Sequence, residues 1–321
     1  MAAWARALVG FGIVVSVGAC HRDAPPSAHG PSPGATVAAS AAQPAHRMVR
    51  PDATDPSIGA PEDPHEVFVP EGKKNGKLFV FLPGTHGKPS NVENILALAA
   101  EHGYLTIGLS YPDDVAAAGC RSDLACYGAF RQRAFDGTGG SRLVDVSPAN
   151  AIENRLVKLL EHLDASAPGE GWGAFLAGGK PVYGSIAFAG HSQGGGHAAF
   201  IAMQHPVARV IMFSSICDAA DGEPPIAASW VSAKHATPID RYYGFDNTGD
   251  KFAAHVAATW TALGLDGLRK ASVDRTSPPY GGAHELTTSI RGPTPMWAHK
   301  SVLHEHDGVN FRDVWAYLIG P

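Results

Sequence analysis

The stretch GHSQGGGHAA, residues 190–199, decides the fold. It places Ser192 between Gly190 and Gly194 in the pattern G-x-S-x-G, and Gly194 is the first of three consecutive glycines. In a nucleophile elbow, a serine with this spacing lies on a sharp turn between a strand and a helix, where small residues let the neighbouring backbones come close. A glycine-rich surface turn would show the same letters without any chemistry, so the flanking sequence has to decide between the two.

The residues on both sides of the motif predict a buried strand and a helix. The apolar run SIAFA, residues 185–189, leads into the motif, and a helical pattern over residues 195–205 leaves it. Further apolar runs predict strands at residues 77–83, 104–111, 208–215, 240–245 and 270–275. Helical patterns alternate with these runs at residues 91–103, 147–163, 251–264 and 308–320. This alternation predicts an α/β fold with a mostly parallel central sheet and helices on both faces, the setting that a nucleophile elbow requires.

Length and composition are those of a globular protein. The chain has 321 residues, of which 45% are hydrophobic and 17% are charged, and a formal net charge of −5 without long runs of one sign. A nucleic-acid binder would show a basic footprint, which is absent from this sequence. We therefore expect a small-molecule substrate.

Residues 1–20 predict an export signal. An apolar stretch of eleven residues, 7–17, follows Arg6 and is too short to span a bilayer. The segment ends in VGAC, which resembles the bacterial lipobox, and this resemblance implies that Cys20 is lipidated. The alternative is a simple secretory signal that is cleaved near Ala19. Either way we expect an exported protein, as a cell-envelope lipoprotein or in periplasmic or secreted form, that meets the membrane only through this anchor.

Residues 21–64 are rich in Pro, Ala, Ser and Gly and show no helical or strand period. Such a segment buries too little apolar surface to offset its ordering entropy, so we expect a flexible tether before a domain at residues 65–321.

Export also affects how the cysteines are interpreted. Cys120 and Cys126 lie six positions apart, and in an oxidising compartment we expect them to form a disulfide. Cys217 follows an apolar run and is interpreted as a core thiol.

At residues 65–321 the chain resembles the α/β-hydrolase superfamily. The resemblance rests on the elbow in its strand and helix context and on the local strings FLPGT, GYLTIGLSYP, AGHSQGGGHAA and AHKS, which are similar to those of bacterial secreted or lipoprotein α/β hydrolases. It implies the α/β-hydrolase fold and a catalytic serine, acid and histidine in that chain order, each on a loop at the carboxyl end of a strand. Ser192 would be the nucleophile.

The acid is expected in the loop DNTGDKF, which follows the strand predicted at residues 240–245. Asp250 is favoured because it lies just before the next helix, where the acid loop of the superfamily usually ends. Asp246 is the alternate, with a turn-forming role as its other interpretation. Asp218 is the third choice, because some members carry the acid after the preceding strand.

Two histidines satisfy the required order. His299 lies shortly before the final helix, the usual position in the superfamily, and is favoured as the general base. His284 follows two glycines after the strand predicted at residues 270–275 and remains the alternate. For the oxyanion, the backbone N–H of Gln193 is one expected donor. The string GTHG resembles the oxyanion loop of the superfamily and implies Thr85 as the second.

These residues predict a serine hydrolase that cleaves a small-molecule carboxylic ester and uses no cofactor. HEHDG, residues 304–308, superficially resembles a metal-binding string, but no second ligand cluster is evident, so no metal is expected. The alternative is an inactive cell-envelope protein that keeps the fold and uses its cleft only for binding. Amidase, thioesterase and acyltransferase activities share the same machinery and stay open. We expect residues 112–146 and residues 218–238, with Trp230, to shape the pocket.

Overall fold

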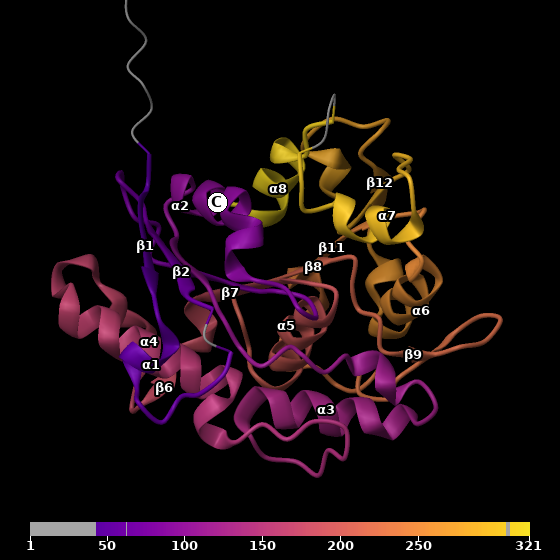
Figure 1. Ribbon diagram of the computed structural model, residues 1–321. Helices are drawn as coiled ribbons and strands as arrows, with labels where there is room; N and C mark the ends of the chain where they lie inside the picture. The colour runs from indigo at the N-terminus through magenta and orange to yellow at the C-terminus, as the bar shows by residue number, and fades with distance from the viewer. Residues whose placement is uncertain (1–42, 62, 306–308) are drawn as a thin grey trace, which may run out of the picture. The chain divides into compact units, whose positions relative to one another are not determined.

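A nine-stranded sheet forms the centre of the computed structural model, which describes residues 43–61, 63–305 and 309–321 (Figure 1). The spatial order is β1-β2-β4-β3-β7-β8-β11-β13-β12. Its strands, in chain order, are β1 (Ala45–Val49), β2 (His65–Val69), β3 (Leu78–Leu82), β4 (Leu105–Gly108), β7 (Ile186–His191), β8 (Arg209–Phe213), β11 (Tyr242–Asn247), β12 (Lys270–Ser272) and β13 (Glu285–Thr288). The predicted signal peptide and Cys20 lie outside the described residues.

The sheet is mostly parallel, as the sequence predicted. β1 and β2 pair antiparallel, β2 and β4 pair antiparallel, and every pairing from β4 to β12 is parallel. Two short hairpins lie outside this sheet, β5 (Leu176–Ala177) with β6 (Lys180–Pro181) and β9 (Ala219–Ala220) with β10 (Ile226–Ala227). Because parallel strands share one carboxyl edge, the loops that follow β3, β7, β8 and β11 meet on the same side of the molecule.

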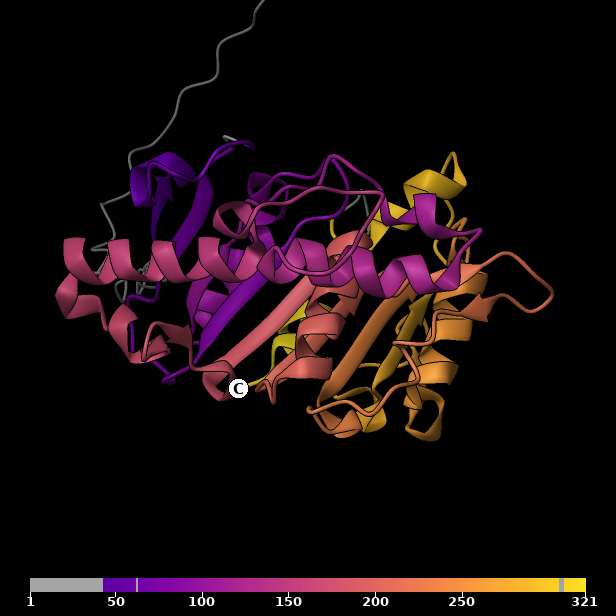
Figure 2. The same cartoon turned by 90° about the horizontal axis from the view of Figure 1, so that it is seen from below.

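Helices cover both faces of the sheet (Figures 1 and 2). They are α1 (Pro51–Thr54), α2 (Glu93–Glu101), α3 (Leu124–Asp136), α4 (Ile152–Ser166), α5 (Gln193–Gln204), α6 (Ala253–Leu263), α7 (Pro295–Ser301) and α8 (Arg312–Ile319). One hydrophobic cluster joins the sheet to α3, α4, α5 and α6, and a second joins it to α2 and α8. Figure 2 shows α3 and α4 lying across the face of the sheet that the first cluster covers.

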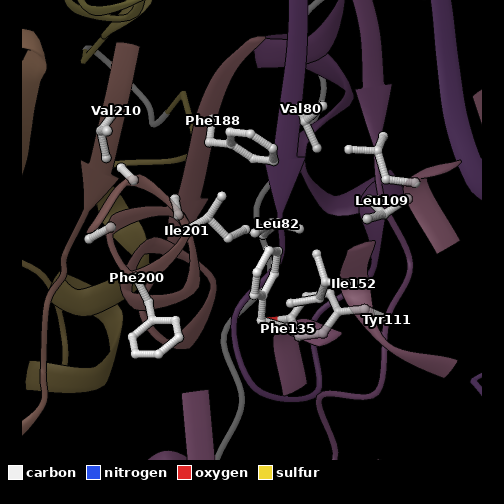
Figure 3. Packing of buried hydrophobic residues seen from close by; sticks show 14 of the residues in the cluster. Val80, Leu82, Leu109, Tyr111, Phe135, Ile152, Phe188, Phe200, Ile201 and Val210 are labelled. Atoms are coloured by element: carbon white, nitrogen blue, oxygen red, sulfur yellow. The ribbon is translucent and has the colours of Figure 1, made fainter. Parts of the chain in front are cut away.

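Strand β3 illustrates why the central strands read as continuous apolar runs. Its side chains alternate, so that Leu78, Val80 and Leu82 enter the first cluster while Phe79 and Phe81 enter the second. All five are fully buried, because helices cover both faces. Figure 3 shows the first cluster, with Val80, Leu82, Phe188 and Val210 from neighbouring strands packed near Phe200 and Ile201 of α5.

The prediction of a tether that reaches residue 64 is wrong for its last part. Strand β1, Ala45–Val49, pairs antiparallel with β2, and α1 follows it directly. In β1, Val49 is buried in the main core, while Ala45 and His46 are exposed. An edge strand with so little buried apolar surface has no clear sequence signal, so the domain begins at β1 rather than at residue 65.

The predicted disulfide between Cys120 and Cys126 is present. Its second cysteine, Cys126, lies in the first turn of α3, a helix that the sequence analysis did not predict. Asp123 caps the first turn of α3 by accepting a hydrogen bond from the Ala125 N–H at 3.0 Å, and Gly137 ends the helix in the left-handed conformation at φ 79°. None of the helices in the described part of the chain is both long and apolar enough to cross a membrane.

Candidate functional site

A pocket of about 640 Å³ lies at the carboxyl edge of the sheet. Its wall includes Ser192, His299, Thr85 and Gln193, four of the residues that the sequence analysis selected. The loops after β3 and β7 and the helix α7 therefore bring together residues that lie far apart in the chain, such as Thr85 and His299. Pockets at this edge are the usual ligand sites of parallel α/β sheets.

Ser192 occupies a strained turn between β7 and α5. Its backbone lies at φ 51° and ψ −118°, a region that a residue with a side chain rarely adopts. The surrounding glycines make this turn possible, since a β-carbon on Gly190 would collide with the backbone of Gly194, and one on Gly194 would collide with the carbonyl of Leu82. The serine itself is only half-buried. Strain of this kind is retained where the structure presents a side chain for use.

His299, which lines this pocket, is in contact with Asp250 behind it. His299 Nδ1 lies 2.6 Å from Asp250 Oδ2, and both side chains are almost completely buried. A carboxylate only accepts hydrogen bonds, so Nδ1 carries the proton and Nε2 is left as the basic nitrogen. This is the tautomer that a general base acting on a serine requires. Of the two histidines and three aspartates considered from sequence, only His299 and Asp250 form a histidine–carboxylate contact, and His299 lines the pocket.

His299 lies in a helix that the sequence analysis placed in a loop. Thr294 caps α7 by accepting a hydrogen bond from the Trp297 N–H at 3.0 Å, and Pro295 occupies its first turn. The Thr-Pro pair is a recognisable helix start, and it could have been used to predict this element. The histidine is thus held by regular backbone hydrogen bonds rather than by a mobile loop.

The geometry is incompatible with His284 as the alternate base. His284 immediately precedes β13, a strand that the sequence analysis did not predict, and therefore lies at the amino end of the sheet. Its Nδ1 lies 2.8 Å from the Tyr242 carbonyl, and its ring stacks on Tyr243 with a centroid distance of 4.2 Å. The run ELTT is short and mostly polar, so it gave no strand signal and the position of this histidine in the sheet was not predicted.

Asp218 does not contact a histidine either. Its carboxylate accepts two hydrogen bonds from Arg131, at 2.9 and 2.6 Å, and one from the Trp230 indole at 3.0 Å. Arg131 also donates through Nη1 to the Gln193 carbonyl at 2.6 Å. The buried pair of Arg131 and Asp218 thus holds the first residue of α5, next to the serine. Sequence reasoning missed Arg131 because its partner lies 87 positions away.

Asp246 stands behind the acid loop and not in the pocket. It is buried at the end of β11 and accepts a hydrogen bond from Ser214 Oγ at 2.9 Å. Burial, and secondly the neighbouring Asp250 carboxylate, raise the pKa of Asp246 to about 8. Asp246 therefore keeps its proton at pH 7.

Replacing Asp246 with Asn should make the protein less sensitive to alkaline pH. In the wild-type protein the carboxyl keeps its proton when folded but loses it when unfolded above its ordinary pKa of 3.8, so stability falls as the pH rises from 3.8 to about 8. Asn cannot ionise and removes this loss. We expect the melting temperatures of D246N and wild type to be similar at pH 5, and that of D246N to be the higher at pH 8.5, by differential scanning fluorimetry. Burial also raises the pKa of Asp113 to about 7. Because Asp113 is present in both proteins, its effect on the melting temperature cancels in the comparison. If the melting temperatures of D246N and wild type differed equally at pH 5 and pH 8.5, the raised pKa of Asp246 would be contradicted.

The two expected oxyanion donors lie on segments that are bonded to each other. Thr85 Oγ1 donates to Gln193 Oε1 at 3.0 Å, and a β-carbon on Gly84 would lie only 3.2 Å from Ser192 Cβ. Asp113 stabilises the loop that carries Thr85, because it accepts a hydrogen bond from the Gly87 N–H at 3.0 Å. Within the described ranges, no acceptor takes the backbone N–H of Thr85 or of Gln193. Both N–H groups are therefore available to a ligand.

Two further positioning residues escaped sequence reasoning. His191, the middle residue of the G-H-S motif, donates from Nε2 to the His299 carbonyl at 2.9 Å, and burial lowers its pKa to about 3, so that it stays neutral. Asn247 joins the acid loop to α7, since its Oδ1 accepts from the Gly249 N–H at 2.9 Å and its Nδ2 donates to Ser301 Oγ at 3.0 Å. Neither residue has a local sequence signal, because each acts across elements that are distant in the chain.

Cys217 packs against the first hydrophobic cluster, as predicted, but it is only half-buried and also borders the pocket. Burial and the nearby carboxylates raise the pKa of its thiol, which leaves it protonated and a poor nucleophile.

Of the two segments expected to shape the pocket, residues 112–146 do so, through Ala117, Arg121 and Arg131 among others. The excursion at residues 218–238 contributes only Asp218 to the described lining, since Trp230 is buried behind it.

The described residues contain no group of three or more His, Cys, Asp or Glu side chains arranged to hold a metal ion. The HEHDG string lies partly outside these residues, because positions 306–308 are not described.

No protein-family model matches the sequence, and no curated protein matches it. Among solved structures, a dienelactone hydrolase from Anabaena variabilis is similar at 16% identity and a TM-score of 0.41, covering 82% of this chain and 94% of its own. Esterase B from Lactobacillus rhamnosis is similar at 13% identity and a TM-score of 0.42, covering 81% and 84%. Carboxyl esterase 2 from Tuber melanosporum is similar at 10% identity and a TM-score of 0.41, covering 83% and 82%. At such values the assignment of function rests on this chain's own strand order and side-chain geometry.

Proposed function

Because the chain has the α/β-hydrolase fold, with a strained serine between β7 and α5, we propose that it is a serine hydrolase that cleaves carboxylic esters through an acyl-enzyme intermediate. The observation that carries the proposal is the 2.6 Å contact between His299 Nδ1 and Asp250 Oδ2, in which the histidine lines the same pocket as Ser192. A buried histidine and carboxylate in contact, with the histidine and an elbow serine on one pocket wall, have no evident use in a protein that only binds.

The proposed reaction uses each group in turn. Ser192 Oγ attacks the ester carbonyl carbon while His299 Nε2 takes the hydroxyl proton, and Asp250 stabilises the resulting imidazolium. The backbone N–H groups of Gln193 and Thr85 donate hydrogen bonds to the oxyanion, aided by the positive end of α5. The histidine then passes the proton to the leaving alcohol, which departs as the C–O bond breaks. Water, deprotonated by the same histidine, attacks the acyl group and frees the serine.

We also propose that the enzyme works outside the cytosol. The disulfide between Cys120 and Cys126 supports an oxidising compartment. Export would follow from the predicted signal at residues 1–20, and anchoring from lipidation of Cys20.

A fluorophosphonate probe tests the proposed function directly. The reagent bonds to a serine only when a base activates that serine, so intact-protein mass spectrometry should show one adduct, and peptide mapping should place it on Ser192. The domain from about residue 43 onward, without the predicted signal, is sufficient for the assay. A folded protein that acquires no adduct would favour the alternative, an inactive envelope protein that uses the cleft only for binding.

A further inference from the structure

The charges that line the pocket have the opposite sign to the chain as a whole. Five lining side chains are cationic, namely Lys88, Arg121, Arg131, Lys251 and Lys300, whereas Asp218 is the only carboxylate among the described lining residues. The whole chain carries a formal net charge of −5. A cleft that concentrates positive charge raises the local concentration of anionic ligands.

Protein carboxylates neutralise two of these five cations. Arg131 is paired with Asp218, and Lys88 Nζ lies 2.8 Å from Asp63 Oδ1. For Arg121, Lys251 and Lys300, no carboxylate in the described ranges comes within ion-pair distance. Among the residues that the structure describes, these three positive charges at the pocket therefore have no carboxylate counter-ion.

Arg121 is the most constrained of the three. Its Nε is inaccessible to solvent and has no hydrogen-bond partner among the described residues. A buried donor without a partner is costly, and the cost is removed when a ligand accepts the bond. The backbone of Arg121 is fixed, because it follows the disulfide-bonded Cys120 and its N–H donates to the Ala118 carbonyl at 3.3 Å. The backbone that carries the guanidinium is thus held at the edge of the pocket.

The position of Arg121 relates it to the proposed catalytic centre. Its guanidinium carbon lies 5.3 Å from the centroid of the Phe252 ring, and Lys251 Nζ lies 4.6 Å from the same centroid. The Phe252 ring in turn meets the His299 ring edge-on, at a centroid distance of 5.1 Å. The acid loop holds Phe252 in place, since its N–H donates to Asp250 Oδ1 at 2.9 Å. One aromatic ring therefore separates the unpaired cations from the imidazole.

We propose that the ester substrate carries a carboxylate a few atoms from the scissile bond, and that Arg121 binds this carboxylate with help from Lys251. This inference rests on the proposed function and names its substrate class. A guanidinium presents a planar fork that matches a carboxylate in two parallel hydrogen bonds, whereas the lysine ammonium adds a less directional charge. The lining groups of Phe252 and Met296 leave room for a short apolar spacer between carboxylate and ester.

Two matched pairs of esters test the proposal on both sides of the scissile bond. The first pair is mono-4-nitrophenyl glutarate and its neutral amide, 4-nitrophenyl glutaramate. The second pair is 4-carboxyphenyl butyrate and 4-carbamoylphenyl butyrate. In at least one pair we expect kcat/KM to favour the carboxylate by about tenfold, the size of one charge-assisted hydrogen bond, and the preference to shrink between 50 and 500 mM NaCl.

Substitutions assign the preference to its residues. Arg121→Gln should lower the ratio of the two kcat/KM values by about tenfold, Arg121→Lys should restore part of it, and Lys251→Gln should lower it less. Lys73→Gln makes the same change of charge at an exposed position before β3, at the opposite end of the sheet, and should leave the ratio unchanged. Melting temperatures show whether each variant is folded. A wild-type protein with no preference in either pair, or a folded Arg121→Gln variant that keeps it, would overturn the proposal.

A binding measurement separates this proposal from the proposed function. Calorimetric titration of the Ser192→Ala protein with monomethyl glutarate and with monomethyl succinate requires no turnover, and Arg121→Gln in that background should weaken the binding of at least one of them about tenfold. If neither ester pair is hydrolysed and Ser192 is not labelled, the proposed function fails while titration still decides the carboxylate site. If hydrolysis occurs without discrimination or Arg121-dependent binding, only the carboxylate inference fails.

Discussion

Replacing Ser192 with alanine is expected to reduce ester hydrolysis by a factor on the order of 10⁴ to 10⁶ and to abolish fluorophosphonate labelling. The hydroxyl is the only group proposed to form the covalent intermediate, so its loss leaves only the binding and oxyanion interactions to accelerate the attack of water. The fold should survive, because the Ser192 hydroxyl makes no hydrogen bond with the described residues and alanine removes a single oxygen. Initial rates on a neutral 4-nitrophenyl ester give the measurement.

The control for this experiment is Ser232→Ala. Ser232 is exposed, lies outside the pocket, and its hydroxyl donates only to the Ser229 carbonyl at 3.3 Å. Its rate and labelling should equal those of the wild type. If the Ser192→Ala protein kept more than about a hundredth of the activity, or still acquired an adduct, the nucleophile would be another residue.

Replacing His299 with alanine should lower kcat/KM by a similar factor, while His284→Ala should change it by less than about threefold. The difference follows from position, since His299 shares the pocket with Ser192 and binds Asp250, whereas His284 stacks on Tyr243 at the other end of the sheet. Asp250→Asn should reduce the rate by about 10³ to 10⁴, because the amide no longer fixes the tautomer of the imidazole. Steady-state kinetics of the three variants at pH 7 and pH 8 supply the test.

The pattern across these variants matters more than any single value. An inactive His284→Ala protein that remained folded would mean that the imidazole at the amino end of the sheet takes part in the chemistry. A fully active His299→Ala protein would remove the base from the proposed mechanism. Either result would contradict the geometry of the pocket.

The sequence predicted the central strands and the elbow well, for a physical reason. A strand such as β3 is buried on both faces and therefore reads as an unbroken apolar run, and the glycines around Ser192 are forced by backbone contact. β1 is an edge strand that buries little apolar surface, and β13, which lies between β11 and β12, carries mostly polar side chains. Neither strand reads as an apolar run, and both were missed. Because β13 was not predicted, His284 remained a candidate for the base.

The site was predictable only in part, because local patterns do not report long-range partners. Chain order suggested Ser192, Asp250 and His299, and the structure places the last two in contact. Arg131, His191 and Asn247 act through bonds to residues far away in the chain, so no spacing within a single segment could have identified them. The unpaired Nε of Arg121 is likewise visible only in three dimensions.

The segment between β4 and α4, which carries α3, contributes no strand to the sheet. It supplies one side of the pocket, including Ala117 and Arg121, but none of the groups proposed to make or break bonds. If the proposed function holds, exchanging this insert between related enzymes would alter which acids or alcohols are accepted. Any such graft would have to bring its own equivalent of Arg131, since that guanidinium tethers the insert to the turn that bears the nucleophile.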